Sequence, residues 1–465
     1  MDDKKKYSDE LFFKKKNAYE IMDERECVRA NEFCDGYIDF LSTAKTEREC
    51  VRYAVEVATN NGFVKYDGNL SLKAGDKFYK VQRNKAVVLG VIGKSDISND
   101  VNIVMAHIDA PRVDLKQNPL YEDSGVALFK THYYGGIKKY QWTAIPLSLH
   151  GVVIKKGGEC VEINIGESEG DPVFTITDLL PHLAGDQMMK KATEVVAGES
   201  LNILVGSRPF KDDDESQKIK LSVMDILNKK YGITESDFMR ADLEAVPAFP
   251  AKSVGFDQSL VGAYGQDDRV CAYSALMAAL SLEAPQKTAL CVLVDREEIG
   301  SMGNTGAQSR FIEYLLADLG DTLGGVPVRK IIQNSACLSA DVNLACDPNY
   351  PEVTEKMNTA FINGGVALSK YTGARGKSGT SEASAELVAR ICDIFDSNGV
   401  CYQMGELGKV DQGGGGTVAQ FIANLDMEVL DAGVPILSMH SPFEVSAKAD
   451  VYMAYKAYTT FMEKY

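Results

Sequence analysis

The sequence lacks the features of a secreted or membrane protein. Its ten cysteines include no Cys-x-x-Cys pair and no close-set framework, which argues against a Cys-zinc motif or a disulfide scaffold and is typical of a reducing compartment. No stretch reaches the ~18 consecutive apolar residues that a membrane span needs, and the N-terminus carries no apolar signal segment. We therefore expect a cytoplasmic protein that does not enter a membrane.

Positive charge is also in deficit. The chain has 50 Lys and Arg against 66 Asp and Glu, a net charge of −16 at pH 7. This balance argues against nucleic acid or an anionic membrane as the main partner, although it does not identify a substrate. At 465 residues, 45% of them hydrophobic, the chain is long enough for a large core and more than one domain.

Strand-like and helix-like segments alternate over much of the chain. Apolar runs at 86–92, 101–106 and 289–294 and a shorter one at 330–333 are typical of buried strands, and helical patterns cover 269–280, 308–319, 381–397 and 445–463. Such alternation predicts an α/β fold, with a doubly wound, mostly parallel sheet and helices on both faces.

A segment of different texture interrupts this pattern. Between about 113 and 243 the chain has short alternating segments, Gly-Gly turns, and two helix-like pieces at 181–197 and 216–231. We interpret it as a β-rich domain, 113–243, inserted into a main α/β domain formed by 1–112 and 244–465.

Two adjacent carboxylates, Glu297 and Glu298, follow the apolar run 289–294. Burying neighbouring carboxylates without compensation costs several kcal/mol, so a metal ion or raised pKa values are expected nearby. The alternative is an ordinary charged loop in which Gly300 turns the chain.

Other apolar segments end in the same way. His and acidic side chains stand at or just after the ends of predicted strands or at the start of a helix: His107, Asp109, Asp267, Asp341 and His440. The carboxyl ends of strands in such a sheet line one crevice, so these residues can converge. Two imidazoles with several carboxylates suit a pair of divalent ions such as Zn²⁺. A single strand-end His is more often structural, but two of only five His in the chain close such strands.

The order of these motifs resembles the aspartyl aminopeptidases, a family of two-metal exopeptidases. The similarity runs from about residue 85 to the end and includes the inserted domain. It is carried by AHIDAP at 106–111, EEIGS at 297–301, GAQS at 306–309, SAD at 339–341, DPNY at 347–350 and SMHS at 438–441.

The resemblance implies a peptide hydrolase that removes the N-terminal residue, with a preference for Asp or Glu. It implies that Asp267 bridges two ions, that His107 and Asp341 complete one and that Glu298 and His440 complete the other. Zn²⁺ is the expected metal, with Co²⁺ or Mn²⁺ as alternatives. A metal-bound hydroxide would be the nucleophile, Glu297 the general base and Asp109 the residue that orients His107.

The resemblance also implies a homo-oligomer, a tetrahedral dodecamer, in which the inserted domain supports assembly and covers the active site of the catalytic domain. Peptides would be the partners, with neither nucleic acid nor membrane.

Substrate-binding candidates are His182, Lys370, Arg375, Gly416 and Thr417. Gly416 and Thr417 end a glycine run that lacks the Lys-Ser/Thr of a phosphate-binding loop. Lys370 and Arg375 are either solvated or a pocket for a substrate carboxylate. His182 stands in the segment PHLAGD, where the family has a second His in place of Asp186, so the acidic preference is the least supported part of the resemblance.

Two other functions stay open from the sequence. The same scaffold could serve a metal-dependent amidohydrolase or deacylase, which would accept N-blocked substrates. A non-catalytic assembly or cargo protein would be expected to have lost a ligand or Glu297, and none is missing.

Overall fold

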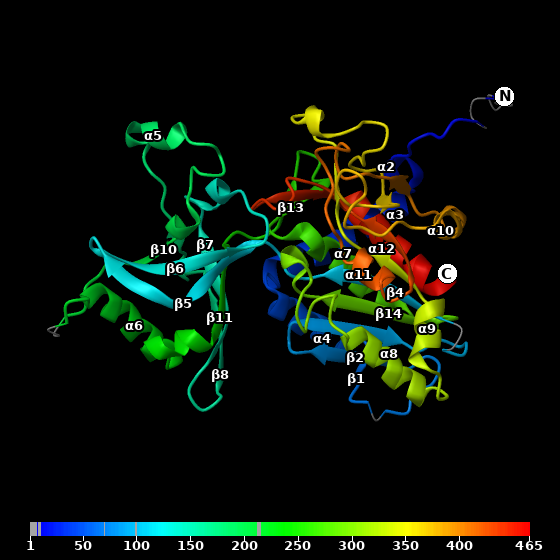
Figure 1. Ribbon diagram of the computed structural model, residues 1–465, viewed down its shortest axis with the longest axis horizontal. Helices are drawn as coiled ribbons and strands as arrows, with labels where there is room; N and C mark the ends of the chain where they lie inside the picture. The colour runs from blue at the N-terminus through cyan, green and yellow to red at the C-terminus, as the bar shows by residue number, and fades with distance from the viewer. Residues whose placement is uncertain (1–6, 8–10, 69, 98–99, 212–214) are drawn as a thin grey trace.

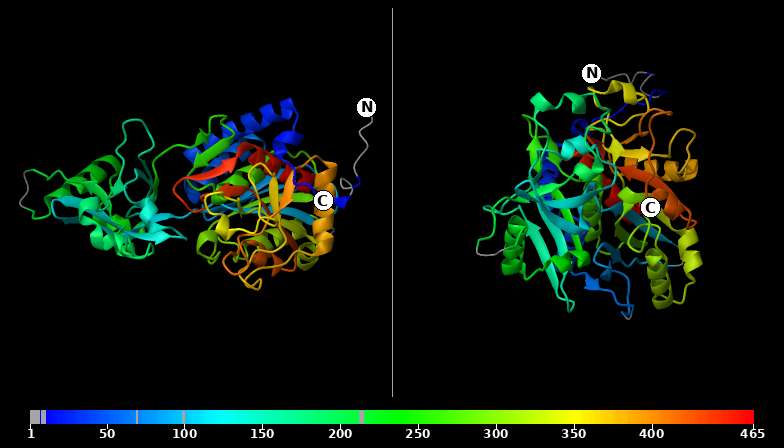
Figure 2. Two further views of the ribbon diagram at one scale, coloured as in Figure 1. Left: turned by 90° about the horizontal axis from the view of Figure 1, so that it is seen from above. Right: turned by 60° about the vertical axis from the view of Figure 1, so that its left-hand side comes forward.

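The computed structural model describes residues 7, 11–68, 70–97, 100–211 and 215–465. Figure 1 shows two bodies, a larger one that contains both ends of the chain and a smaller one built from its middle. The bodies remain side by side when the molecule is turned (Figure 2). Within the described residues, no helix is long and apolar enough to cross a membrane.

A nine-stranded sheet forms the centre of the larger body. In spatial order its strands are β1 (Val64–Lys65), β2 (Lys77–Gln82), β3 (Ala86–Val91), β14 (Thr288–Val294), β4 (Val101–His107), β15 (Ala336–Ser339), β19 (Glu428–Gly433), β17 (Val366–Ser369) and β18 (Tyr402–Met404). The four central strands, β14 to β19, pair in parallel. Antiparallel pairs flank them, β3 with β14 and β17 with β19, so the sheet is mixed.

Helices cover both faces of this sheet. Alternate residues of β4 enter separate cores, Val104 and Ala106 on one face, Ile103 and Met105 on the other, as the two-residue period of a strand requires. The first face packs against α3 (Glu24–Thr43), α4 (Glu47–Asn60), α7 (Gln266–Ser281), α10 (Ala385–Ser397) and α12 (Lys448–Lys464). The second packs against α8 (Phe311–Thr322), α9 (Val328–Asn334) and α11 (Ala419–Ala423).

The strand predicted at 330–333 is wrong, because these residues lie in α9. Pro327 precedes the helix, and Ile331 and Ile332 are buried against the second face of the sheet. A short apolar run has the same composition in a buried strand and on the buried side of a helix.

A five-stranded sheet, which the sequence pattern did not predict, lies beside the large one. Its order is β12 (Lys252–Val254), β13 (Leu260–Ala263), β21 (Glu444–Ala447), β20 (Pro435–Leu437) and β16 (Asn343–Leu344). The short helix α2 (Ala18–Ile21) packs elsewhere, against α12. The small sheet matters for function because it fixes the start of α7 and the turn between β20 and β21.

The smaller body contains an antiparallel seven-stranded sheet. Its order is β8 (Cys160–Ile165), β7 (Leu147–Ile154), β11 (Ala241–Pro247), β5 (Arg112–Asp123), β6 (Val126–Tyr134), β10 (Ile203–Gly206) and β9 (Thr175–Ile176). Helix α6 (Lys218–Tyr231) packs on it, and Trp142 is buried in its separate core.

The helix predicted at 181–197 is largely wrong. Only a 3-10 turn, η2 (Pro181–Leu183), and α5 (Gly185–Met188) form there. Most of the segment is exposed, so no buried face stabilises a longer helix. Elsewhere in the described part of the chain, 3-10 turns form at η1 (Lys139–Trp142), η3 (Gly198–Ser200), η4 (Glu235–Arg240), η5 (Glu297–Ile299) and η6 (Pro351–Val353).

Buried ion pairs join the two bodies where β5 leaves the larger one. Arg112, at the start of β5, lies 3.5 Å from Glu47 of α4 and 3.3 Å from Glu244 of β11. His150 of β7 lies 2.8 Å from Glu49 of α4. These contacts hold the smaller body against the rim of the larger one, close to the end of β4.

Replacing Phe461 of α12 by Ala tests the packing of the first face. Phe461 is fully buried, so the substitution should lower the free energy of unfolding by about 3–5 kcal/mol. Phe256→Ala makes the same chemical change at a fully exposed position and should stay within about 0.5 kcal/mol of the original protein. Urea unfolding measures both, and equal effects would contradict this packing.

Candidate active site

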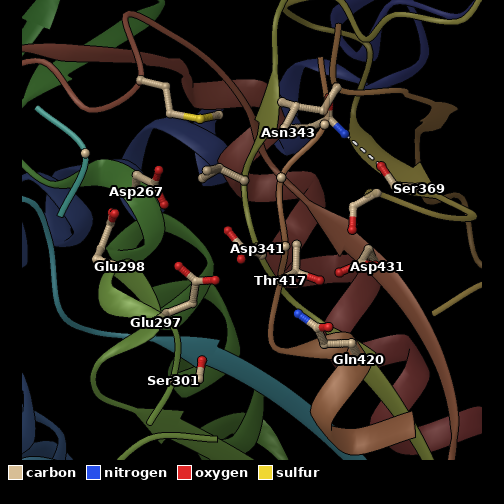
Figure 3. A pocket seen from close by; sticks show the side chains of 18 of the residues that line it. Asp267, Glu297, Glu298, Ser301, Asp341, Asn343, Ser369, Thr417, Gln420 and Asp431 are labelled. Carbon is tan, nitrogen blue, oxygen red and sulfur yellow. Dashed lines mark hydrogen bonds between the residues drawn. The ribbon is translucent and has the colours of Figure 1, made fainter. Parts of the chain in front are cut away.

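Five segments that are far apart in the sequence bring six polar side chains together, and all of these except that of His107 line one cavity. His107 ends β4, Glu297 and Glu298 form η5 just after β14, and Asp341 follows β15 by two residues. Asp267 stands at the start of α7, and His440 in the turn between β20 and β21. The cavity has a volume of about 460 Å³, and Figure 3 shows the carboxylates of Asp267, Glu297, Glu298 and Asp341 around it.

Asp267 lies between the two imidazoles. Its Oδ1 is 3.2 Å from Nε2 of His107, and its Oδ2 is 3.1 Å from Nε2 of His440. Asp341 Oδ1 lies 3.8 Å from the same atom of His107, and Glu298 Oε2 lies 3.6 Å from that of His440. One carboxylate thus joins two similar groups of ligand atoms.

Asp109, which is fully buried, organises the segments around it. Its carboxylate lies 3.3 Å from Nδ1 of His107 and accepts a hydrogen bond from the Tyr134 hydroxyl at 2.8 Å. It also accepts from the backbone N–H groups of Glu297 and Glu298, at 3.1 and 3.2 Å. Asp109 therefore fixes both the imidazole and the turn that carries the paired glutamates.

Glu444 organises the opposite side of the site. The sequence did not identify this residue. This buried carboxylate accepts from the backbone N–H of Asp267 at 3.1 Å and from that of His440 at 2.6 Å. Burial raises the pKa of Glu444 to about 8. Glu444 begins the short strand β21, and no apolar run precedes it that would have indicated a strand end.

The smaller body also reaches the site, through the backbone that follows β6. Nδ1 of His440 lies 2.8 Å from the carbonyl oxygen of Gly136. Tyr134, which binds Asp109, is two residues earlier. The sequence Tyr-Gly-Gly at 134–136 contains no pattern that indicates this contact with a His.

Burial dominates the electrostatics of three carboxylates at the site. It raises the pKa of Glu297 to about 7 and holds the pKa values of Glu298 and Asp341 well above their ordinary range. Burial opposes charge on the two imidazoles, yet hydrogen bonds to Asp109 and Asp267 raise the pKa of His107, and the bond to Asp267 raises that of His440 to about 10. The protein alone thus crowds negative charge that only protons or cations can balance.

The donor set fits divalent cations. The ligand atoms of His107, Asp267 and Glu298 lie within 4.8 Å of one another, as do those of His107, Asp268 and Asp341. Two buried oxygens, Glu298 Oε1 and Asp268 Oδ1, have no hydrogen-bond partner in the described structure. Buried orphan acceptors beside imidazoles, with no thiolate among them, suit Zn²⁺ or a similar ion.

The substrate-binding residues predicted from the sequence lie in different places. Gly416 and Thr417 line the cavity. Arg375 lines a neighbouring cavity of about 330 Å³, together with Lys377 and Lys409. Lys370 lines neither of the two.

His182 is exposed in η2, just before α5, and α5 lies at the outer edge of the smaller body (Figure 1). It does not line the cavity of its own chain.

The far wall of the cavity contains polar residues that sequence reasoning did not single out. Asn343, Ser369, Gln420 and Asp431 lie there, across the cavity from Asp267 and Glu298 (Figure 3). Asp431 interrupts the apolar run of β19, which was the one signal that could have identified it.

Comparison with known proteins agrees with this geometry. The model of the family described as aminopeptidase I zinc metalloprotease (M18) matches residues 40–462. A probable M18 family aminopeptidase 1 of Clostridium acetobutylicum is 48% identical over 96% of this chain and 98% of its own length. The crystal structure of an M18 aminopeptidase from Thermotoga maritima has a TM-score of 0.94 and 44% identity, covering 98% of this chain and 100% of that one.

More distant structures share the fold. The S. cerevisiae mApe1 dodecamer is 24% identical with a TM-score of 0.75, over 94% of this chain and 96% of that one. With the family model matching most of the chain and relatives of 44–48% identity over nearly its full length, this chain belongs to the M18 family of zinc metalloproteases and is an aminopeptidase.

Proposed function

We propose that this enzyme removes the N-terminal residue from peptides with the help of two divalent ions, most simply Zn²⁺. The observation that carries the proposal is the position of Asp267, whose two oxygens each face a different imidazole, at 3.2 and 3.1 Å. A carboxylate placed in this way is suited to bridging two ions. The aminopeptidase names of the relatives favour this reaction over the amidohydrolase and assembly alternatives.

In this proposal His107 and Asp341 complete one metal site, and Glu298 and His440 complete the other. Asp109 contacts the imidazole of His107, and Glu444 accepts hydrogen bonds from the backbone N–H groups of Asp267 and His440. Both carboxylates would thus support the metal ligands without binding the metal themselves. When bound, two divalent ions polarise the scissile carbonyl and lower the pKa of a water molecule. The identity and number of the ions are part of the proposal.

Glu297 is the proposed general base. Its carboxylate lines the cavity, and its Oε2 lies 3.9 Å from Nε2 of His107. Burial raises its pKa to about 7, close to the value at which a carboxylate both takes and returns a proton near neutral pH. Glu297 would take a proton from the attacking water and deliver it to the leaving amine.

The resemblance implies a preference for acidic N-terminal residues, but among its described residues the cavity offers no Lys or Arg side chain to pair with a substrate carboxylate. Arg375 lies in the adjoining cavity. A role for His182 in binding substrate would require a second copy of the chain, because this side chain is outside its own cavity. An assembly such as the yeast dodecamer would supply one, and we propose a homo-oligomer.

We further propose the division into a catalytic domain, 1–112 and 244–465, and an inserted domain, 113–243, that supports assembly and covers the site. The hydrogen bond that Nδ1 of His440 donates to the backbone carbonyl of Gly136 supports a covering role. All ten cysteines are free, which supports a cytoplasmic location.

Asp267→Asn tests the bridging role. The substitution removes the charge shared by the two sites, so both ions should bind more weakly and the purified protein should contain well under one equivalent of zinc. Elemental analysis measures this content. Asp431→Asn, in the same cavity but outside the cluster of ligands, should keep its metal. An Asp267→Asn protein with two equivalents of zinc would refute the assignment.

Paired substitutions separate base from ligand. Glu297→Gln should keep both ions and lose about 10²–10⁴-fold in kcat, the typical contribution of a general acid–base group. Glu298→Gln should lose metal together with activity. Zinc content and aminoacyl p-nitroanilide turnover, measured on both variants, decide the matter, and the reverse pattern would exchange the two roles.

A further inference from the structure

The wall opposite the metal ligands contains hydrogen-bond acceptors that lack donors. Asp431 is 6% exposed and Asn343 is 4% exposed. Asp431 Oδ1 and Asn343 Oδ1 are both buried and have no hydrogen-bond partner in the described structure. Both residues line the cavity. Leaving buried acceptors unpaired is costly, so this wall favours a ligand that donates hydrogen bonds.

Neighbouring side chains do not neutralise Asp431. Ser369, directly opposite it in the β17–β19 pair, donates to the carbonyl of Gly405 and accepts from the side-chain amide of Asn343. That second bond uses the amide N–H of Asn343 and leaves its oxygen free for a ligand. No described Lys or Arg lines the cavity.

Two opposing effects act on the Asp431 carboxyl. Burial raises its pKa to about 6, and the hydroxyls of Ser339 and Thr417 act in the opposite direction. A buried carboxylate without a cationic neighbour is electrostatically unsatisfied, and an ammonium or guanidinium group is its natural partner.

The distance from the ligands to this wall suits a long side chain. Asp431 is level with Ser339 in the parallel β15–β19 pair, and the proposed ligand Asp341 follows Ser339 by two residues. Asp431 lies across a cavity of about 460 Å³ from Asp267 and Glu298 (Figure 3). If the first peptide bond of a substrate lies at the metal ligands and its N-terminal side chain points to this wall, only a long side chain reaches Asp431.

We propose that this wall binds the side chain of the substrate's N-terminal residue and that Asp431 and Asn343 select a basic one, lysine or arginine. The inference rests on the proposed aminopeptidase function and adds the substrate class to it. It also gives a reason for disfavouring Asp and Glu, whose carboxylates would meet Asp431 without an intervening cation.

The experiment compares Lys, norleucine, Leu and Glu p-nitroanilides with the zinc-loaded enzyme. Norleucine resembles lysine without the charge, so the Lys/norleucine ratio of kcat/KM isolates the contribution of the ammonium group. This ratio should be about 10- to 100-fold, as expected for a hydrogen-bonded charge pair. Asp431→Asn should reduce it to within about threefold of unity, mainly through slower turnover of the Lys substrate. Asp318→Asn, at the surface on α8, is the matched control and should leave the ratio unchanged.

Equal turnover of Lys and norleucine substrates by the intact enzyme, or faster turnover of the Glu substrate, would overturn the proposal without involving any variant. An Asp431→Asn enzyme that loses turnover of all substrates equally would also overturn it, since the residue would then act on folding or chemistry and not on selection. If the intact enzyme cleaved none of them, the proposed function would fail. Calorimetric binding of lysine amide against norleucine amide would then decide the selectivity by itself, with equal affinity refuting it.

Discussion

The burial of many carboxylates in one place is the constraint on which the rest of this structure depends. Asp267, Glu298 and Asp341 meet two imidazoles at the carboxyl edge of a sheet whose strands β4 and β14 are mostly apolar and buried at every residue. Unbalanced, such a cluster would cost several kcal/mol, and the protein offers no Lys or Arg among the described residues of the cavity. In the proposed mechanism, two bound cations would supply the missing charge, and the same ions would polarise the substrate.

Two buried carboxylates behind the cluster give it a defined shape. Asp109 holds His107 and the backbone of the Glu297–Glu298 turn, and Glu444 holds the backbones of Asp267 and His440. Asp109 follows β4 of the large sheet by two residues, and Glu444 belongs to the small five-stranded sheet. The two sheets must therefore be correctly placed relative to each other for the two halves of the site to meet. The carbonyl of Gly136 adds the smaller body to the same arrangement.

The sequence was informative where chemistry follows an apolar run. β4 and β14 are buried at every residue, and their continuous hydrophobic sequence predicted both the strands and the meeting of His107 with Glu297 and Glu298. It was not informative where partners come from short elements. Glu444 and Asp431 depend on β21 and β19, whose pairings are set by tertiary packing. Lys370 and Arg375 looked suitable because they are cationic, but neither lines the cavity that contains Asp267.

The most direct test of the central claim is to add zinc to the metal-free enzyme and to measure how many equivalents bind. Titration by calorimetry, with turnover of an aminoacyl p-nitroanilide followed on the same samples, should give two bound equivalents, with full turnover only after the second is bound. Asp267 would then join two ions, as its position between His107 and His440 implies. Full turnover at one equivalent, or turnover that persists after complete removal of metal, would contradict the two-metal account.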